Sequence, residues 1–192
     1  MKFTTLAAAL AGVFIAGQTF AADSYEIDPT HAWVGFKTAH GSWSHAHGTF
    51  KAVSGTISFD KDDVTKSTID LTIEAASIDT NNEKRDTHLK SPDFLNAEEF
   101  PQITFKSTAI EKTGDKTAKV TGDMTVVGTT KPVTFDVTWN GEAALPWDAN
   151  TIKTGFSATG SINGADFGIT KMCDFGLGPD LALDIDIEAI KK

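Results

Sequence analysis

Three histidines lie close together in one short segment, at His40, His45 and His47. On a strand, a His-x-His pair places both imidazoles on one face, a spacing that zinc and similar metals accept. No Cys, Asp or Glu within the segment completes a ligand set. We therefore interpret the segment as a polar loop at the rim of a β structure, and keep a metal-binding protein as an alternative.

Arg85, Asp86 and His88 form a second polar group. An Asp–His pair is what general-base catalysis requires, but no known motif places a Ser or Cys nucleophile beside it. A salt-bridged helix that packs on the end of a strand explains the same residues, and contact with a ligand head group is a further alternative. No phosphate-binding glycine motif opens a helix, so no nucleotide cofactor is expected. The sequence therefore favours a protein that is not an enzyme.

This second group belongs to the only stretch with a predicted helix, Ser77 to Ser107. Thr80 followed by Glu83 has the spacing of a capping box, which predicts that the helix begins at Thr80. Pro92 predicts a second short turn. The helix is polar nearly all round, so it must pack on another element to be stable. The expected anchors are Leu89, Phe94 and Leu95.

The rest of the chain is typical of antiparallel strands with one apolar and one polar face. The final strand shows this most regularly: Leu181, Leu183, Ile185 and Ile187 alternate with acidic residues. We expect a bulge near Ala52 within one strand over 48–60. The other connections expected are a turn at Asp28-Pro29, an irregular loop over 142–150 and a long connection over 164–179. About eight such strands form a barrel or a sandwich, and the helical insertion favours a barrel with a covered mouth.

The composition narrows the function classes. The 192 residues carry a formal net charge of −9, which makes nucleic acid or an anionic membrane surface a poor partner. Residues 1–21 read as a signal peptide, since Lys2 precedes an apolar run too short to span a bilayer and Thr19-Phe20-Ala21 resembles a cleavage site. We therefore expect residues 22–192 to form one exported, periplasmic domain. Cys173 is the only cysteine and is expected to be inert and at least partly buried.

Several motifs in the chain resemble those of one protein family. They include His31-Ala-Trp-Val-Gly-Phe36, Ser77-Ile-Asp-Thr-Asn81, Arg85-Asp-Thr-His-Leu-Lys-Ser91, Phe100-Pro-Gln-Ile-Thr-Phe-Lys-Ser107 and Thr121-Gly-Asp-Met-Thr-Val-Val-Gly128. They are similar, in order and in spacing, to the signature of the YceI-like proteins, which are mostly periplasmic, lipocalin-like barrels that bind polyisoprenoids. The resemblance implies an apolar lumen that holds an isoprenoid lipid, such as a quinone tail. Gly164-Ala165 departs from the family pattern, which often has an Arg there, and Lys171 to Phe175 is also unusual.

We therefore expect an all-β, eight-stranded antiparallel lipocalin-like barrel with a short helical insertion covering it. Its expected function is to carry or store a long-chain isoprenoid lipid, without stable membrane insertion. An enzyme acting on a bound lipid or quinone stays an alternative. A homodimer is left open. Strand parity predicts the ligand-binding residues of the lumen: Val34, Phe36, Phe50, Ile57, Phe59, Ile69, Leu71, Phe94, Phe105, Phe135, Leu183 and Ile185. Polar contacts near the mouth are expected from Arg85, Asp86 and His88.

Overall fold

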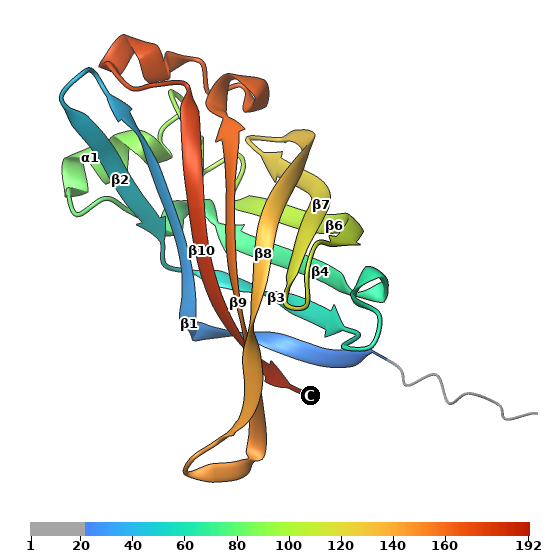
Figure 1. Cartoon of the computed structure of the whole chain (residues 1–192). Helices are drawn as coiled ribbons and strands as arrows, with labels where there is room; N and C mark the ends of the chain where they lie inside the picture. Colours follow the sequence, from blue (N-terminus) through green and yellow to red (C-terminus); the bar gives the residue numbers. More distant parts are fainter. Residues whose placement is uncertain (1–21) are drawn as a thin grey trace, which may run out of the picture.

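A computed structural model describes residues 22–192, so the expected signal peptide lies outside the described residues (Figure 1). Most of this part of the chain is β structure. The strands are β1 (Asp23–His40), β2 (Ser44–Phe50), β3 (Val53–Phe59), β4 (Thr68–Glu74), β5 (Ile78–Asp79), β6 (Gln102–Lys112), β7 (Thr117–Val126), β8 (Thr129–Leu145), β9 (Asp148–Asn163) and β10 (Asp180–Lys191). The helical elements are α1 (Glu83–Lys90) and the 3₁₀ turns η1 (Val64–Lys66), η2 (Ala75–Ser77), η3 (Gly164–Phe167) and η4 (Lys171–Phe175).

The strands form one closed antiparallel barrel. The sheet runs β10-β9-β8-β7-β6-β4-β3-β1, and β10 also pairs with β1, which closes the ring of eight strands. β2 and β5 continue the sheet beyond β1 as a side arm. A barrel and not a sandwich results because β10 follows β1 along nearly its whole length, so no edge is left between them. The predicted barrel is confirmed.

β1 divides its other edge between two partners. Its first residues, from Asp23 to Glu26, pair with β3, and its second half pairs with β2. The predicted turn at Asp28-Pro29 is wrong: the strand continues there, and a break in register against β10 between Ile27 and Ala32 absorbs the proline. The single strand expected over 48–60 is likewise wrong. The chain leaves β2 before Ala52 and starts β3 at Val53, because β2 pairs with the second half of β1 whereas β3 pairs with its first residues and with β4.

The two ends of the barrel differ. The helical end carries the β1–β2 turn, α1, η3 and η4, whereas the ribbon end carries the β8–β9 turn (Figure 1). The irregular loop predicted over 142–150 is wrong, because β8 and β9 continue as a two-stranded ribbon up to Leu145 and Asp148. Figure 1 shows this ribbon extending beyond the barrel.

Two local predictions need correction. The N-cap of α1 is Asn82 and not Thr80: the Asn82 side chain accepts a hydrogen bond from the Arg85 backbone N–H. Cys173, expected to be at least partly buried, is exposed on η4. Strand periodicity does not indicate which side chains of a 3₁₀ turn are exposed. The exposure of Cys173 was therefore not predicted. Among the described residues, no helix has the length and apolar character needed to cross a membrane.

Candidate functional site

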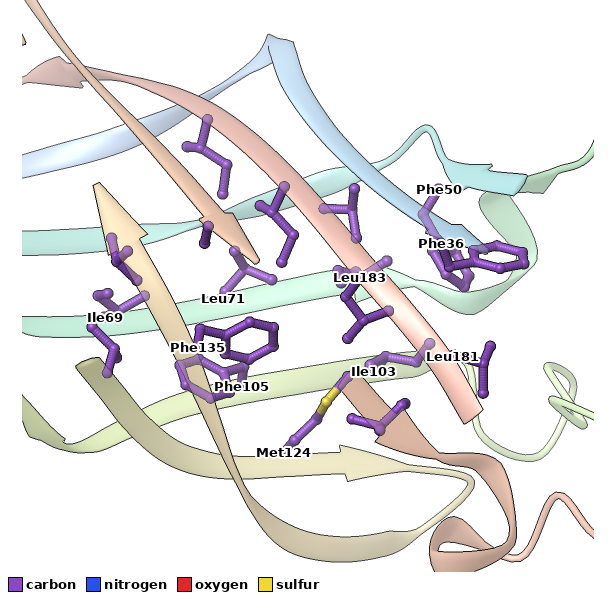
Figure 2. A pocket seen from close by; sticks show the side chains of 18 of the residues that line it. Phe36, Phe50, Ile69, Leu71, Ile103, Phe105, Met124, Phe135, Leu181 and Leu183 are labelled. Atoms are coloured by element: carbon purple, nitrogen blue, oxygen red, sulfur yellow. The ribbon is translucent and has the colours of Figure 1, made fainter. Parts of the chain in front are cut away.

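The candidate site is a cavity inside the barrel with a volume of about 260 Å³. Its walls are almost entirely apolar, and Figure 2 shows side chains from several strands converging on it. This follows from closure, since every second residue of each strand of a closed barrel points inward. The cavity extends from the β6–β7 turn at Gly114 to Met172 and Leu89 at the helical end.

Every apolar residue predicted for the lumen lies on the wall of this cavity. β1 and β2 contribute Val34, Phe36 and Phe50, and the remaining candidates come from the other strands and from the loop after α1. Strand parity and barrel closure together fix the inward face of the strand residues, whereas Phe94 reaches the wall from a loop to which parity does not apply. Their contact with a ligand stays a prediction.

Other lining residues were not predicted from the sequence. Ile103, Met124 and Leu181 lie on the cavity wall in Figure 2. Ile103 and Leu181 have the same parity as Phe105 and Leu183, so the alternation that identified those two residues was sufficient to find them. Met172 and Leu177 also line the cavity, but they belong to the connection over 164–179, which has no strand periodicity that reveals an inward face.

Aromatic pairs shape the cavity along its length. Phe105 and Phe135 meet edge to face in the middle of the barrel, with ring centroids 5.3 Å apart. Toward the ribbon end, Phe59 packs against Trp139 at 5.4 Å and against Phe156 at 5.2 Å. Such edge-to-face packing fills space densely and fixes ring orientation. The ribbon end of the cavity is therefore narrowed by a rigid aromatic group.

Polar groups near the helical end mostly bond to each other. The Arg85 Nε donates to Thr80 Oγ1 at 2.7 Å, and the Arg85 guanidinium also donates to the Thr80 carbonyl at 2.6 Å. The Asp86 carboxylate accepts from the Thr80 backbone N–H at 2.9 Å and from its hydroxyl. Arg85 lines the cavity, whereas Asp86 does not. Arg85 and Asp86 thus fasten the start of α1 to the end of β5, and ligand contact by either stays a prediction.

His88 lies outside the cavity wall, in a contact between two segments that are distant in sequence. Its Nε2 is 3.2 Å from Asp93 Oδ2, and Asp93 also pairs with Lys171 of η4. The hydrogen bonds from Lys171 and His88 hold the pKa of Asp93 below its usual range. The His88 ring stacks edge-on against Phe94 and Phe175. The loop after α1 and η4 are therefore joined over the helical end of the barrel.

The three clustered histidines do not converge. In the β1–β2 pair His40 is opposite Ser44, so these two share a face, while His45 and His47 lie on the other face. The rings of His45 and His47 are 6.3 Å apart, and the His40 ring packs against Trp43 instead. The alternative of a metal site built from all three histidines is therefore wrong in its geometry.

Among the residues that the structure describes, the group whose potential metal ligands come together is Asp28, His31 and Glu188. The Lys153 ammonium lies between them, 2.6 Å from Asp28 Oδ2 and 2.7 Å from Glu188 Oε2. Burial would raise the pKa of Asp28, but hydrogen bonds from Lys153, Thr30 and His31 outweigh it and hold that pKa well below its usual range. The lysine already supplies the positive charge, so the group is an ion-pair network.

A family model described as "YceI-like domain" matches residues 25–189. The UPF0312 protein of Pseudomonas savastanoi pv. phaseolicola is 44% identical over 182 residues, which cover 92% of this chain and 91% of the relative. A UPF0312 protein of Pseudomonas putida (strain F1) is 42% identical over 200 residues, covering 100% and 99%.

Solved structures with the same fold include the YceI protein of Campylobacter jejuni, with a TM-score of 0.72 and 34% identity over 80% of this chain and 90% of that one. Burkholderia cenocepacia BcnA has a TM-score of 0.75 and 23% identity, covering 84% and 98%. A polyisoprenoid binding domain from Saccharophagus degradans has a TM-score of 0.63 and 14% identity, covering 90% and 100%. At these identities the last two show likeness of fold alone.

Proposed function

The chain belongs to the YceI-like family, and from this premise we propose that it is a non-enzymatic binding protein that encloses a polyisoprenoid, an isoprenoid quinone or a similar long-chain lipid. The observation that carries the proposal is the apolar cavity within the closed barrel. The similarity in fold to a polyisoprenoid binding domain supports it. We further propose that the protein is exported to the periplasm, where it carries or stores this lipid.

The chemistry of the wall favours a hydrocarbon cargo. Burying apolar surface contributes about 0.8 kcal/mol per CH₂ group, so an enclosed prenyl or acyl chain is held without any polar contact. A polar group deep in the cavity would lose its hydrogen bonds to water and find few partners on the wall. We therefore propose that the head group of the cargo lies at one of the two ends of the barrel: Arg85 and His47 reach the cavity at the helical end, and Lys116 reaches it at the β6–β7 turn.

The signal-peptide pattern of residues 1–21 supports export. An isoprenoid chain is nearly insoluble in water, so moving it through an aqueous compartment requires a protein that shields it. A closed barrel provides this shield without consuming energy or changing the cargo. Binding alone is thus a sufficient function for this fold.

Organic extraction of the protein, purified from the periplasm of its own cells, followed by mass spectrometry of the extract, tests the proposal. We expect a prenyl quinone or polyprenyl species in about equimolar amount. A matched extract of periplasm from cells that lack the protein controls for free lipid. An extract without lipid from the folded protein would count against the proposed function.

A further inference from the structure

Two exposed aromatic side chains lie on neighbouring segments at the helical end. Among the described residues, the large hydrophobic side chains that stay exposed are Trp33, Trp43, Trp147 and Phe175, and Trp43 is 79% exposed. Trp43 is the last residue of the turn between β1 and β2, and Phe175 ends η4. The Gly41 N–H donates to the Gly176 carbonyl at 2.7 Å, which ties the β1–β2 turn to the end of η4. Trp43 and Phe175 therefore lie on two surface segments whose backbones are hydrogen-bonded to each other.

This part of the surface connects to the cavity. The Phe175 ring is 5.6 Å from the Phe94 ring, centroid to centroid, and Phe94 lines the cavity. Leu177, two residues after Phe175, lines it too, and its backbone is bridged to His40 beside the turn. A continuous series of apolar side chains thus runs from the solvent-exposed Phe175, through Phe94, to the wall of the cavity. We refer to this series as the apolar path. Trp147, the exposed tryptophan of the turn between β8 and β9, lies at the ribbon end and is not part of this path.

We propose that the helical end docks on the surface of a phospholipid bilayer, with Trp43 and Phe175 entering the membrane interface, and that cargo moves between bilayer and cavity at this contact. This inference rests on the proposed function. A lipid chain that leaves the cavity into water loses about 0.8 kcal/mol for each exposed CH₂ group, so direct contact with the bilayer removes the main barrier to transfer. Tryptophan is well suited to an interface because its ring is apolar and its indole N–H remains hydrated.

The surroundings favour a bilayer over a protein partner. The residues beside Trp43 and Phe175 are small or polar, including Ser42, Ser44 and Asp174, and all are exposed. Two separate aromatic tips do not provide the continuous surface of about 1,000 Å² that a stable protein interface needs. They do match a shallow insertion into lipid, which needs only isolated apolar anchors.

Charge contributes little to this contact. Lys171 is already paired with Asp93, and Asp174 lies between Lys171 and Phe175. The chain as a whole carries a net charge of −9, which disfavours an anionic surface. Docking is therefore expected to depend on the aromatic side chains and to weaken, not strengthen, as the fraction of anionic lipid rises.

The test compares Trp43→Ala with Trp147→Ala, because both tryptophans are exposed at turns, at 79% and 81%, on opposite ends of the barrel. Each purified protein is sedimented with vesicles of phosphatidylcholine, and with vesicles that contain one quarter phosphatidylglycerol. We expect Trp43→Ala to lower the vesicle partition coefficient roughly tenfold, which corresponds to a loss of about 1.4 kcal/mol of binding free energy. Trp147→Ala should leave the partition coefficient unchanged. Phe175→Ser should act like Trp43→Ala, and thermal unfolding checks that both variants are folded.

Equal binding by Trp43→Ala, Phe175→Ser and the wild type, or no vesicle binding by the wild type, overturns the inference. Extraction and mass spectrometry of the same preparations separate it from the proposed function. If the protein contains cargo but Trp43→Ala binds vesicles as well as the wild type, the docking is contradicted and the proposed function is not. Absence of cargo together with loss of vesicle binding in Trp43→Ala contradicts the proposed function and leaves the docking surface standing.

Discussion

The ring of Phe135 on β8 lies over Gly160 on the neighbouring strand β9. A methyl group added at Gly160 would be 2.7 Å from Phe135 Cδ1. Phe135 in turn meets Phe105 edge to face, so the glycine sets how far both rings extend into the cavity. A residue without a side chain thereby determines the width of the cavity at its middle.

We expect Gly160→Ala to push the Phe135 ring into the cavity and to lower the amount of bound lipid. The free energy of unfolding should fall by about 1–2 kcal/mol, the usual effect of overpacking where a side chain can move aside. Extraction with mass spectrometry measures the first effect and urea denaturation the second. Gly155→Ala is the matched control on the same strand, since no atom lies closer than 3.7 Å to its added methyl group. Lipid content unchanged in Gly160→Ala would contradict this role of Phe135.

Leu71→Arg should abolish lipid loading while the β-sheet circular dichroism spectrum remains. Leu71 is 7% exposed and is paired with Phe105 across β4 and β6, so the guanidinium enters the cavity. An apolar cargo would have to remove water from that charge without offering a hydrogen bond, which is strongly unfavourable. We expect at least a tenfold loss of lipid in the extract.

Thr72→Arg tests whether this loss depends on the direction of the side chain. Thr72 follows Leu71 on β4, so its side chain points to the outer face of the barrel. This variant should keep its lipid. Equal loading of the Leu71 and Thr72 variants would refute the cavity as the binding site.

Lys153→Met should destabilise the protein by about 2 kcal/mol at neutral pH, because Asp28 loses a charged hydrogen-bond donor in a buried position. The Asp28 pKa is lowered in the folded state, so its ionised form adds stability at pH values above the unfolded pKa of about 3.9. That stability is lost as the pH falls toward the lower folded value. His31 and Glu188, the other groups that face Lys153, belong to the same network.

The pH profile of unfolding separates this ion pair from a packing effect. Without Lys153 the Asp28 pKa should rise toward its unfolded value, so the acid-induced loss of stability should be smaller than in the wild type and should end at a higher pH, although it begins at the same unfolded pKa. The raised Lys153 pKa predicts that its contribution in the wild type is lost only as the pH rises through that value at the alkaline end. Lys119→Met removes an exposed pair with Asp136 and should change little. If the free energy of unfolding of Lys153→Met and of the wild type fell in parallel with decreasing pH, the stabilising role of the Lys153–Asp28 ion pair would be contradicted.

Asp86→Ala should loosen α1. The Thr80 backbone N–H and hydroxyl lose their acceptor, which costs about 1–2 kcal/mol for a residue that is 8% exposed. Hydrogen exchange of the α1 amides should become faster, while exchange in β6 to β10 stays as in the wild type. Lys84→Ala, an exposed change in the same helix, is the control. Unchanged exchange in α1 would show that Asp86 does not anchor the helix.

The sequence by itself determined which face each regular strand presents to the interior. Alternation in segments such as Thr68–Glu74 fixes which side chains share a face, and this local property does not depend on which strand is the neighbour. For the same reason Leu71, Phe105 and Leu183 were assigned correctly to the cavity wall. Motif order was sufficient to identify the family.

The tertiary structure alone decided the features that depend on partners distant in the chain. β1 continues through Asp28-Pro29 because β10 holds both of its halves, and the strand expected over 48–60 divides because β2 and β3 pair differently. Met172 reaches the cavity from a segment without periodicity. The histidines separate because strand pairing places His40 on one face and His45 on the other. Pairing across the sheet is set by the closure of the whole barrel, and no local pattern of residues encodes it.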